Sequence, residues 1–155
     1  MTARCALISG EGTRDDDAGM PNYRRVWVPG GTYFFTVALM QRDRRLLMEH
    51  IESLQMAFRV FAPARPFGTL AAVVLPEHLH CIWRLPPEDA DYATRWRHIK
   101  SSFSSSLPCT ESRSGRRVLK GERGIWQRRY WEHLIRDERD LAVHIDYVHF
   151  NPVKH

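Results

Sequence analysis

Residues 67–85, FGTLAAVVLPEHLHCIWRL, contain two β-rich runs separated by a short break at Pro76-Glu77. The runs cover 68–75 and 78–85, and both are rich in the branched and aromatic residues that favour strands. Parallel neighbours need a crossover connection of about a dozen residues or more, so a break this short joins antiparallel strands. We therefore predict an antiparallel pair of neighbouring strands.

The segment before this pair predicts one strand and one helix. The sequence PGG at 29–31 is a turn signal, and a β-rich run over 32–39 follows it. Apolar residues then recur at helical spacing over 44–61, and the prolines that follow end the helix. The order up to the antiparallel pair is therefore strand, helix, strand, strand.

The segment after the pair predicts a helix, a loop, a strand and a second helix. The prolines and acidic residues of PPEDAD, at 86–91, suit a helix start, and a polar stretch over 110–124 is typical of a loop. The aromatic run over 125–135 suits a fourth strand, and Asp137 can cap a last helix that extends through Tyr147 or beyond. The first of these helices has an apolar face made of Tyr92, Trp96, Ile99 and Phe103.

The first six elements match the βαββαβ order of a ferredoxin-like sheet. We predict an α+β fold with an antiparallel sheet, helices on one face, and a C-terminal helix that carries Tyr147. The chain has 155 residues and is 43% hydrophobic, which suits one domain. We assign residues 20–155 to this domain. We expect residues 1–19 to form a disordered tail, with Met20 as an alternative start.

Charge and cysteine content narrow the class of protein. The net charge of +5 favours an anionic partner, although a solvated basic surface would give the same value. The three cysteines are widely spaced and do not form a disulfide framework, so we expect a cytoplasmic location. No apolar run approaches the length of a membrane span, so we expect no membrane partner.

His78 and His80 stand two residues apart in the second strand of the predicted pair. Side chains at this spacing point to the same face of a strand, so the two imidazoles share one face. Two imidazoles can bind a divalent cation, but two protein ligands rarely suffice. The pair therefore has two interpretations, which are structural histidines at the start of a strand or part of a metal site.

The last helix offers a third ligand and a nucleophile. At about 100° per residue, a polar stripe of Asp140, His144, Tyr147 and Asn151 runs beside an apolar stripe of Leu141, Ile145 and Val148. The Asn151 side-chain oxygen would be the third ligand, and the Tyr147 hydroxyl would lie beside the metal. This donor set suits Mg²⁺ or Mn²⁺ acting on a phosphate. The alternative is an amphipathic helix with an ordinary tyrosine at its rim.

Basic residues gather over 113–129, and Trp126, Tyr130 and Trp131 interleave with the end of this run. Cations bind phosphates and aromatic rings stack on unpaired bases, so we predict contact with nucleic acid. A solvated loop followed by a core strand is the alternative, and we expect Trp27, Trp83 and Trp96 to be core residues. The predicted DNA-binding residues are Arg24, Arg25, Arg113, Arg116, Arg117, Lys120, Arg123, Arg128 and Arg129.

Several blocks of the sequence resemble the REP-associated tyrosine transposases, bacterial relatives of the single-tyrosine insertion-sequence transposases. The shared signature is a His-hydrophobic-His motif, here HLH at 78–80, followed by a helical tyrosine, here Tyr147. The resemblance covers residues 20–155. The blocks are MPNYRRVWVPGGTYFFTV, VVLPEHLHCIWRLP, ATRWRHIKSSFS, RGIWQRRYWEHLIRDERD and DYVHFNPVKH.

This resemblance implies a ferredoxin-like sheet, a divalent metal (Mg²⁺ or Mn²⁺), and cleavage of single-stranded DNA near REP-type hairpins. It implies that Tyr147 attacks a phosphodiester, forms a 5′-phosphotyrosine link and releases a 3′-hydroxyl that can later rejoin the strands. By position, His78 and His80 are the metal pair and Asn151 is the third polar ligand. We expect a monomer, with a dimer as the alternative. We assign His133 no catalytic role, although it could support the site or contact DNA, and His144 and Asp140 could support the metal ligands from behind.

Two other functions fit some of these features. A catalytically silent module that binds hairpin DNA would keep the fold and the basic residues, but it would need neither Tyr147 nor the histidines. A metal-dependent hydrolase of a small phosphate ester would use water as its nucleophile and would not need the basic run.

Overall fold

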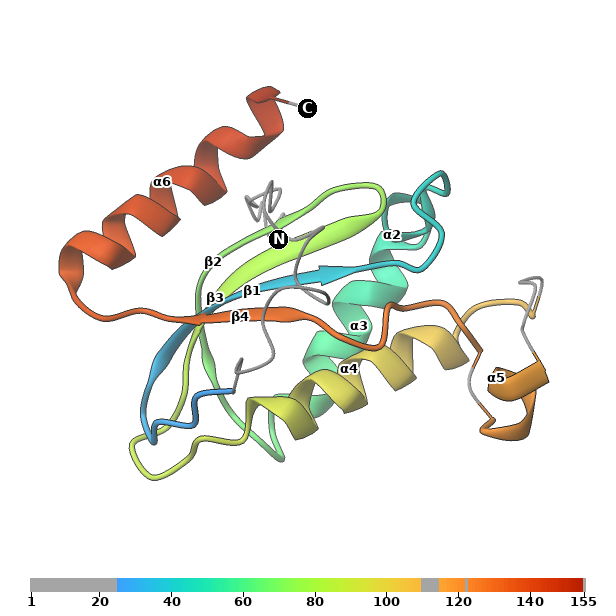
Figure 1. Cartoon of the computed structure of the whole chain (residues 1–155), viewed down its shortest axis with the longest axis horizontal. Helices are drawn as coiled ribbons and strands as arrows, with labels where there is room; N and C mark the ends of the chain where they lie inside the picture. The colour runs from blue at the N-terminus through green and yellow to red at the C-terminus, as the bar shows by residue number, and fades with distance from the viewer. Residues whose placement is uncertain (1–24, 110–114, 122, 155) are drawn as a thin grey trace.

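The computed structural model describes residues 25–109, 115–121 and 123–154, and these form one α+β unit (Figure 1). The predicted tail over 1–19 and the predicted DNA contacts of Arg24 and Arg113 lie outside the described residues. Among the described helices, none combines the length and the apolar composition that a bilayer crossing requires.

A four-stranded antiparallel sheet is the centre of the fold, with the strand order β2-β3-β1-β4. This order and the βαββαβ succession confirm the predicted ferredoxin-like sheet. The strands are β1 (Thr32–Ala38), β2 (Gly68–Val74), β3 (His78–Arg84) and β4 (Trp131–Leu134).

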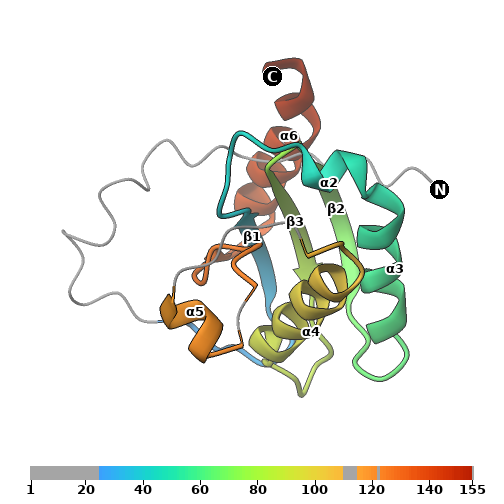
Figure 2. The same cartoon turned by 90° about the vertical axis from the view of Figure 1, so that its right-hand side faces the viewer.

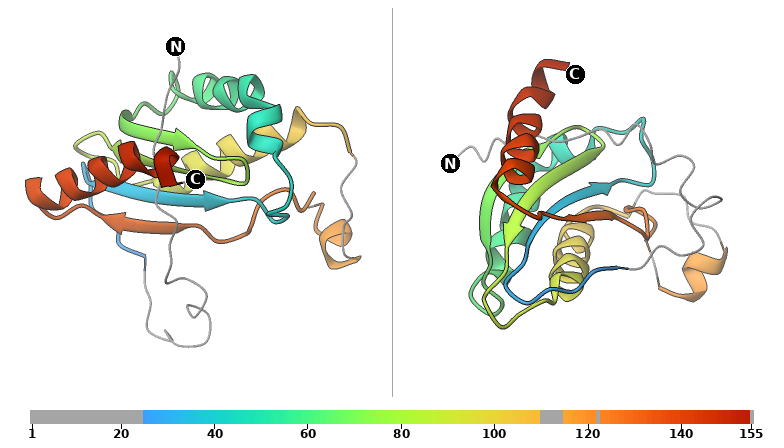
Figure 3. Two further views of the ribbon diagram at one scale, coloured as in Figure 1. Left: turned by 90° about the horizontal axis from the view of Figure 1, so that it is seen from above. Right: turned by 60° about the vertical axis from the view of Figure 1, so that its left-hand side comes forward.

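The helices divide between the two faces of the sheet. Helices α3 and α4 pack against each other on one face, and α6 crosses the other face over β2 and β3 (Figures 1 and 3). The short helix α5 lies at the opposite end of the molecule from the start of α6 (Figures 1 and 2). The helices are α2 (Leu46–Glu49), α3 (Ile51–Phe61), α4 (Tyr92–Ser105), α5 (Gly115–Leu119) and α6 (Glu138–Lys154).

Alternation along β3 separates the core from the candidate site. Leu79, Cys81 and Trp83 point toward α3 and α4, where the Trp83 ring stacks on Trp96 at 4.3 Å between centroids. The intervening side chains, His78 and His80, therefore point to the face that α6 covers. Both faces of β3 are buried, and strands of this kind are usually apolar throughout. Two buried imidazoles in such a strand therefore indicate a specific role.

Helix α6 begins and packs as its sequence predicts. The backbone N–H of Asp140 donates to Asp137 Oδ1 at 2.8 Å, which is the predicted N-terminal cap. Val148 is fully buried, and Leu141 and Ile145 pack half-buried against the core. The apolar stripe thus holds the helix on the sheet, and Tyr147 of the polar stripe beside it lies near His80 of β3.

Three local predictions are corrected by the structure. The predicted helix over 44–61 is two helices, because His50 (φ −119°, ψ 37°) leaves helical geometry between α2 and α3. The predicted loop over 110–124 contains helix α5. The predicted strand over 125–135 is regular only in β4, because Trp126 makes an isolated bridge to Leu39 and the chain then leaves the sheet edge.

Candidate active site

The two histidines of β3 are buried under α6 and lie against each other. His78 is 3% exposed and His80 is not exposed, and their ring centroids are 5.1 Å apart at an interplanar angle of 85°. Both side chains come from one strand at a spacing of two residues, so the pleat alone brings them together.

In both imidazoles, Nδ1 already has a hydrogen-bond partner within the protein. His80 Nδ1 lies 2.6 Å from Thr36 Oγ1 on β1, and His78 Nδ1 lies 2.8 Å from Glu77 Oε1. When Nδ1–H donates in these bonds, the lone pair of each ring is on Nε2, which is then the atom that can ligate a metal. In metal-binding histidines, a hydrogen bond to the nitrogen that does not bind the metal fixes the orientation of the ring.

His80 is held in its neutral form. Burial of its imidazole, reinforced by the neighbouring His78, lowers the pKa of His80 well below its ordinary value of 6.5. At neutral pH the ring is therefore uncharged, which is the state that a metal ligand requires.

Helix α6 brings Tyr147 beside His80, and the buried Asn151 follows four residues later on the same helix. The half-buried Tyr147 ring lies 6.3 Å from the His80 ring, centroid to centroid, at an angle of 83°. Asn151 is 2% exposed. Within the described residues, neither Asn151 Oδ1 nor His80 Nε2 has a hydrogen-bond partner. An unsatisfied buried polar atom costs about 1–3 kcal/mol, and a cation between these acceptors would remove that cost. The residues therefore fit the divalent ion that the sequence predicts.

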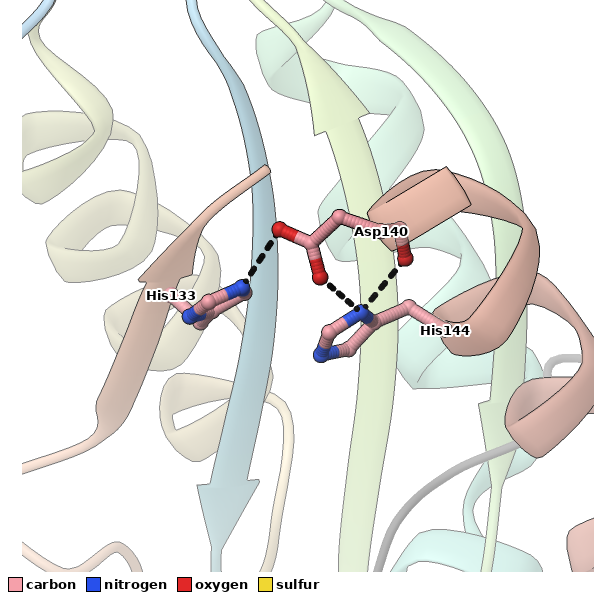
Figure 4. A group of neighbouring side chains, drawn as sticks. All are labelled: His133, Asp140 and His144. Atoms are coloured by element: carbon pink, nitrogen blue, oxygen red, sulfur yellow. Dashed lines mark hydrogen bonds and ion pairs between the residues drawn. The ribbon is translucent and has the colours of Figure 1, made fainter. Parts of the chain in front are cut away.

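The other two members of the polar stripe face a histidine on β4. His133 Nε2 lies 2.9 Å from Asp140 Oδ2, and His144 Nδ1 lies 3.1 Å from Asp140 Oδ1 (Figure 4). We call His133, Asp140 and His144 the β4–α6 cluster. The sequence suggested supporting roles for these three residues but did not predict that they meet. The i, i+4 spacing of Asp140 and His144 was visible, but the position of His133 depends on how β4 joins α6.

Two of the predicted DNA-binding residues make contacts inside the protein. Arg25 forms an ion pair with the buried Glu132 at 2.5 Å, and its guanidinium lies 4.2 Å from the Tyr130 ring centroid. Arg123 donates to the carbonyls of Ser104, Leu107 and Pro108 at the end of α4. These contacts give both residues a structural role, and their contact with DNA stays a prediction.

The remaining described basic residues lie at the surface. Arg117 is half-buried and the others are exposed. They are Arg116, Arg117, Lys120, Arg128 and Arg129.

The tryptophans divide differently from the prediction. Trp83 and Trp96 are core residues as predicted, but Trp27 is 48% exposed and stacks on Tyr92 at 4.4 Å. Trp126, predicted to interleave with the basic run, is 6% exposed and donates to the carbonyl of Lys100, so it belongs to the core. Trp131 is 37% exposed on the α6 face of β4.

The burial of His80 makes the stability of the protein depend on pH. Because the pKa of His80 is lower in the folded state, the unfolded chain takes up a proton near pH 6.5 and the folded chain does not. The free energy of unfolding should therefore fall as pH drops below 6.5, by up to about 1.4 kcal/mol per pH unit from this group. Urea unfolding at pH 7.5, 6.5 and 5.5 measures the free energy of unfolding and its dependence on pH. His80→Gln should have a shallower slope than wild type, and equal slopes would contradict the assignment.

Known proteins resemble this chain over most of its length. No family model matches the chain. A protein of Haemophilus influenzae named as a REP-associated tyrosine transposase is 44% identical over 138 residues, which are 88% of this chain and 78% of the relative. The REP-associated tyrosine transposase of Escherichia coli is 44% identical over 136 residues, covering 88% and 74% of the two chains.

Solved structures agree with these sequence relatives. The structure of a REP-associated tyrosine transposase bound to a REP hairpin superposes with a TM-score of 0.73 at 44% identity, over 88% of this chain and 74% of that chain. A structure from Deinococcus radiodurans named as a transposase has a TM-score of 0.51 at 16% identity, which shows a shared fold. On the identity and coverage of its relatives, the chain belongs to the family of REP-associated tyrosine transposases.

Proposed function

We propose that the protein nicks and rejoins single-stranded DNA near REP-type hairpins through a covalent 5′-phosphate link to Tyr147. The observation that carries this proposal is the approach of the Tyr147 ring to the buried His80 imidazole beneath α6. A nucleophile beside two histidines and a buried amide oxygen is the arrangement that this chemistry needs. The REP hairpin in the solved relative supports the proposed class of partner.

His78, His80 and Asn151 would hold a Mg²⁺ or Mn²⁺ ion. The donor set of two imidazoles and one amide oxygen leaves coordination positions for a phosphate. When bound, such an ion neutralises charge on the phosphate and stabilises the departing oxygen. Thr36 and Glu77 orient the two imidazoles through Nδ1, and the buried setting keeps His80 neutral.

Tyr147 supplies the nucleophilic oxygen. Its phenolic oxygen forms a bond to phosphorus while the bond from phosphorus to the 3′ oxygen breaks. The phenol gives up one proton and the 3′ oxygen takes one up. The phosphotyrosine bond conserves the energy of the original phosphodiester, so a 3′-hydroxyl can attack it and rejoin strands without a further energy source.

The site is complete within one chain. Tyr147 on α6 and the histidines on β3 belong to the same chain, and the Tyr147 ring lies near the His80 ring. A single copy therefore holds every residue that the proposed reaction uses, which supports a functional monomer.

The exposed basic residues would hold the DNA backbone. The strongest candidates are Arg116, Lys120, Arg128 and Arg129, because their side chains are exposed. Helix α5 lies at the opposite end of the molecule from the start of α6 (Figures 1 and 2), so a DNA that contacts both α5 and the start of α6 must extend along the molecule. A hairpin with a single-stranded extension has that shape. Arg24, Arg25, Arg113, Arg117 and Arg123 remain in the proposed contact set.

Trapping the covalent link tests the proposal. A single-stranded oligonucleotide with a REP-type hairpin, labelled at its 3′ end, is incubated with the protein and Mn²⁺ and run on a denaturing gel. A labelled band at the size of the protein plus the 3′ fragment is the expected result. Hairpin binding without cleavage would favour the silent binding module, and repeated turnover of a small phosphate ester without an adduct would favour the hydrolase.

A further inference from the structure

The β4–α6 cluster has the composition of a metal site that the proposed reaction does not use. It offers two imidazoles and one carboxylate, which is a common donor set for Zn²⁺ and also suits Mn²⁺. We propose that His133, Asp140 and His144 bind a second divalent metal ion, and that this ion fixes the start of the tyrosine helix to the sheet.

The donor atoms are already close to the spacing that a metal needs. His133 Nε2 and Asp140 Oδ2 are 2.9 Å apart, and His144 Nδ1 and Asp140 Oδ1 are 3.1 Å apart. One ligand atom from each residue lies within 4.8 Å of the others. Neighbouring ligands of a tetrahedral Zn²⁺ are about 3.3 Å apart, so the two contacts to Asp140 differ from that spacing by a few tenths of an ångström. His144 Nδ1 also lies 2.8 Å from the backbone oxygen of Asp140, and metal binding replaces that hydrogen bond.

The side chains converge from two elements of the fold. His133 projects from β4, and Asp140 and His144 project from the first turns of α6 toward it (Figure 4). The two imidazole rings stack at 4.6 Å between centroids and an angle of 18°, so one ring must turn about its side-chain bonds for both nitrogen lone pairs to point at one ion. An ion shared by these residues would therefore join the edge strand to the helix.

The cluster is separate from the histidines of β3. The Phe34 ring stands between them, 4.9 Å from the His144 ring and 5.3 Å from the His80 ring by their centroids. The cluster also differs in accessibility, because its side chains are 27%, 12% and 16% exposed for His133, Asp140 and His144. An ion can therefore reach it from solvent without entering the buried site.

Asp140 is charged in this setting. Its partial burial raises the pKa, but hydrogen bonds from the Arg136 backbone N–H and from His133 outweigh that effect and leave the pKa of Asp140 below its ordinary value. The Arg136 side chain lies 3.6 Å from Asp140 Oδ2 but is 75% exposed, so it can turn into solvent when a cation binds. The carboxylate charge of Asp140 is then available to the metal ion.

The position of the cluster gives the ion a consequence for Tyr147. His144 lies three residues before Tyr147 on α6, so fixing His144 to β4 limits how far the tyrosine can move from His80. This consequence rests on the proposed function, whereas the binding of the ion does not.

The proposed site is tested by Zn²⁺ binding to a variant that lacks the two histidines of β3. The background is the full chain with His78→Ala and His80→Ala, titrated with Zn²⁺ alone by calorimetry at pH 7.5. We expect one Zn²⁺ per chain, and we expect Asp140→Asn or His133→Ala, each added to this background, to weaken binding by about a hundredfold or more. His149→Ala removes an exposed histidine elsewhere on α6 and should leave the affinity unchanged.

Two outcomes would overturn the proposal. One is no Zn²⁺ binding by the double-histidine background, and the other is binding that Asp140→Asn and His133→Ala leave unchanged. Circular dichroism confirms folding, and either cluster variant suffices if the other does not fold. Zn²⁺ should also raise the Tm of the background and not that of its Asp140→Asn derivative, and an equal effect on both would refute the link between strand and helix. A missing DNA adduct would contradict the proposed function and leave this site standing.

Discussion

Tyr147→Phe should abolish the covalent protein–DNA adduct and lower strand cleavage by about a thousandfold or more. The substitution keeps the half-buried ring that lies 6.3 Å from His80 and deletes only the hydroxyl oxygen. No other change is expected at the sheet, because the packing of α6 depends on Val148 and its apolar neighbours. The measurement is the rate of adduct formation with 3′-labelled hairpin DNA and Mn²⁺ on a denaturing gel.

Tyr130→Phe is the matched control for this experiment. Tyr130 is also half-buried, but its ring packs near Phe35 and Trp96 on the face opposite α6. Burial raises the pKa of its phenol to about 12, so it is a poor source of phenolate. Tyr130→Phe should keep the adduct. Adduct formation that survives Tyr147→Phe would assign the nucleophile to another residue.

His80→Ala should lower cleavage by at least about a hundredfold with either Mg²⁺ or Mn²⁺, while hairpin binding persists. His80 is fully buried, and its Nε2 has no hydrogen-bond partner among the described residues. On the proposed function, loss of this ligand would leave only His78 and Asn151 to hold the ion. EDTA should cause the same loss of cleavage in the wild-type protein. Excess Mn²⁺ should then restore cleavage by wild type but not by His80→Ala.

Thr36 provides a graded version of the same experiment. Thr36→Val removes the hydroxyl that lies 2.6 Å from His80 Nδ1 and keeps the shape of the side chain. Second partners of metal-binding histidines typically contribute about 10–100-fold to affinity or activity, so an intermediate loss of cleavage is expected. Electrophoretic mobility shifts with the same hairpin check DNA binding. Full cleavage by His80→Ala, or by wild type in EDTA, would exclude the metal-dependent mechanism.

Local patterns were enough to predict much of this fold. The alternation in HLHCIW places His78 and His80 opposite Leu79, Cys81 and Trp83, and the structure divides them in that way. The cap at Asp137 predicted the start of α6, and the helical period predicted that Val148 packs on the sheet. These features depend only on neighbours within a few residues, whose geometry a strand or helix fixes.

Other features depend on contacts between distant segments. Arg25 lies in a basic pair that suggests DNA contact, yet its guanidinium pairs with Glu132, 107 positions away. Trp27 resembles a core residue by type, but it lies on the surface against Tyr92. Apolar residues recur at helical spacing throughout 44–61, so the sequence did not predict the break between α2 and α3 at His50. In each case the composition of the segment is compatible with more than one environment.

The sequence by itself determined the succession of strands and helices along the chain, the shared face of His78 and His80, and the polar stripe that carries Tyr147 and Asn151. Only the tertiary structure decided that the stripe faces these histidines and that its first two residues meet His133 on β4. Spacing along a strand or helix sets which side chains share a face, because the backbone repeats every two or 3.6 residues. The packing of the elements decides which neighbours each face contacts. For α6, this depends on the path of the chain between β4 and α6.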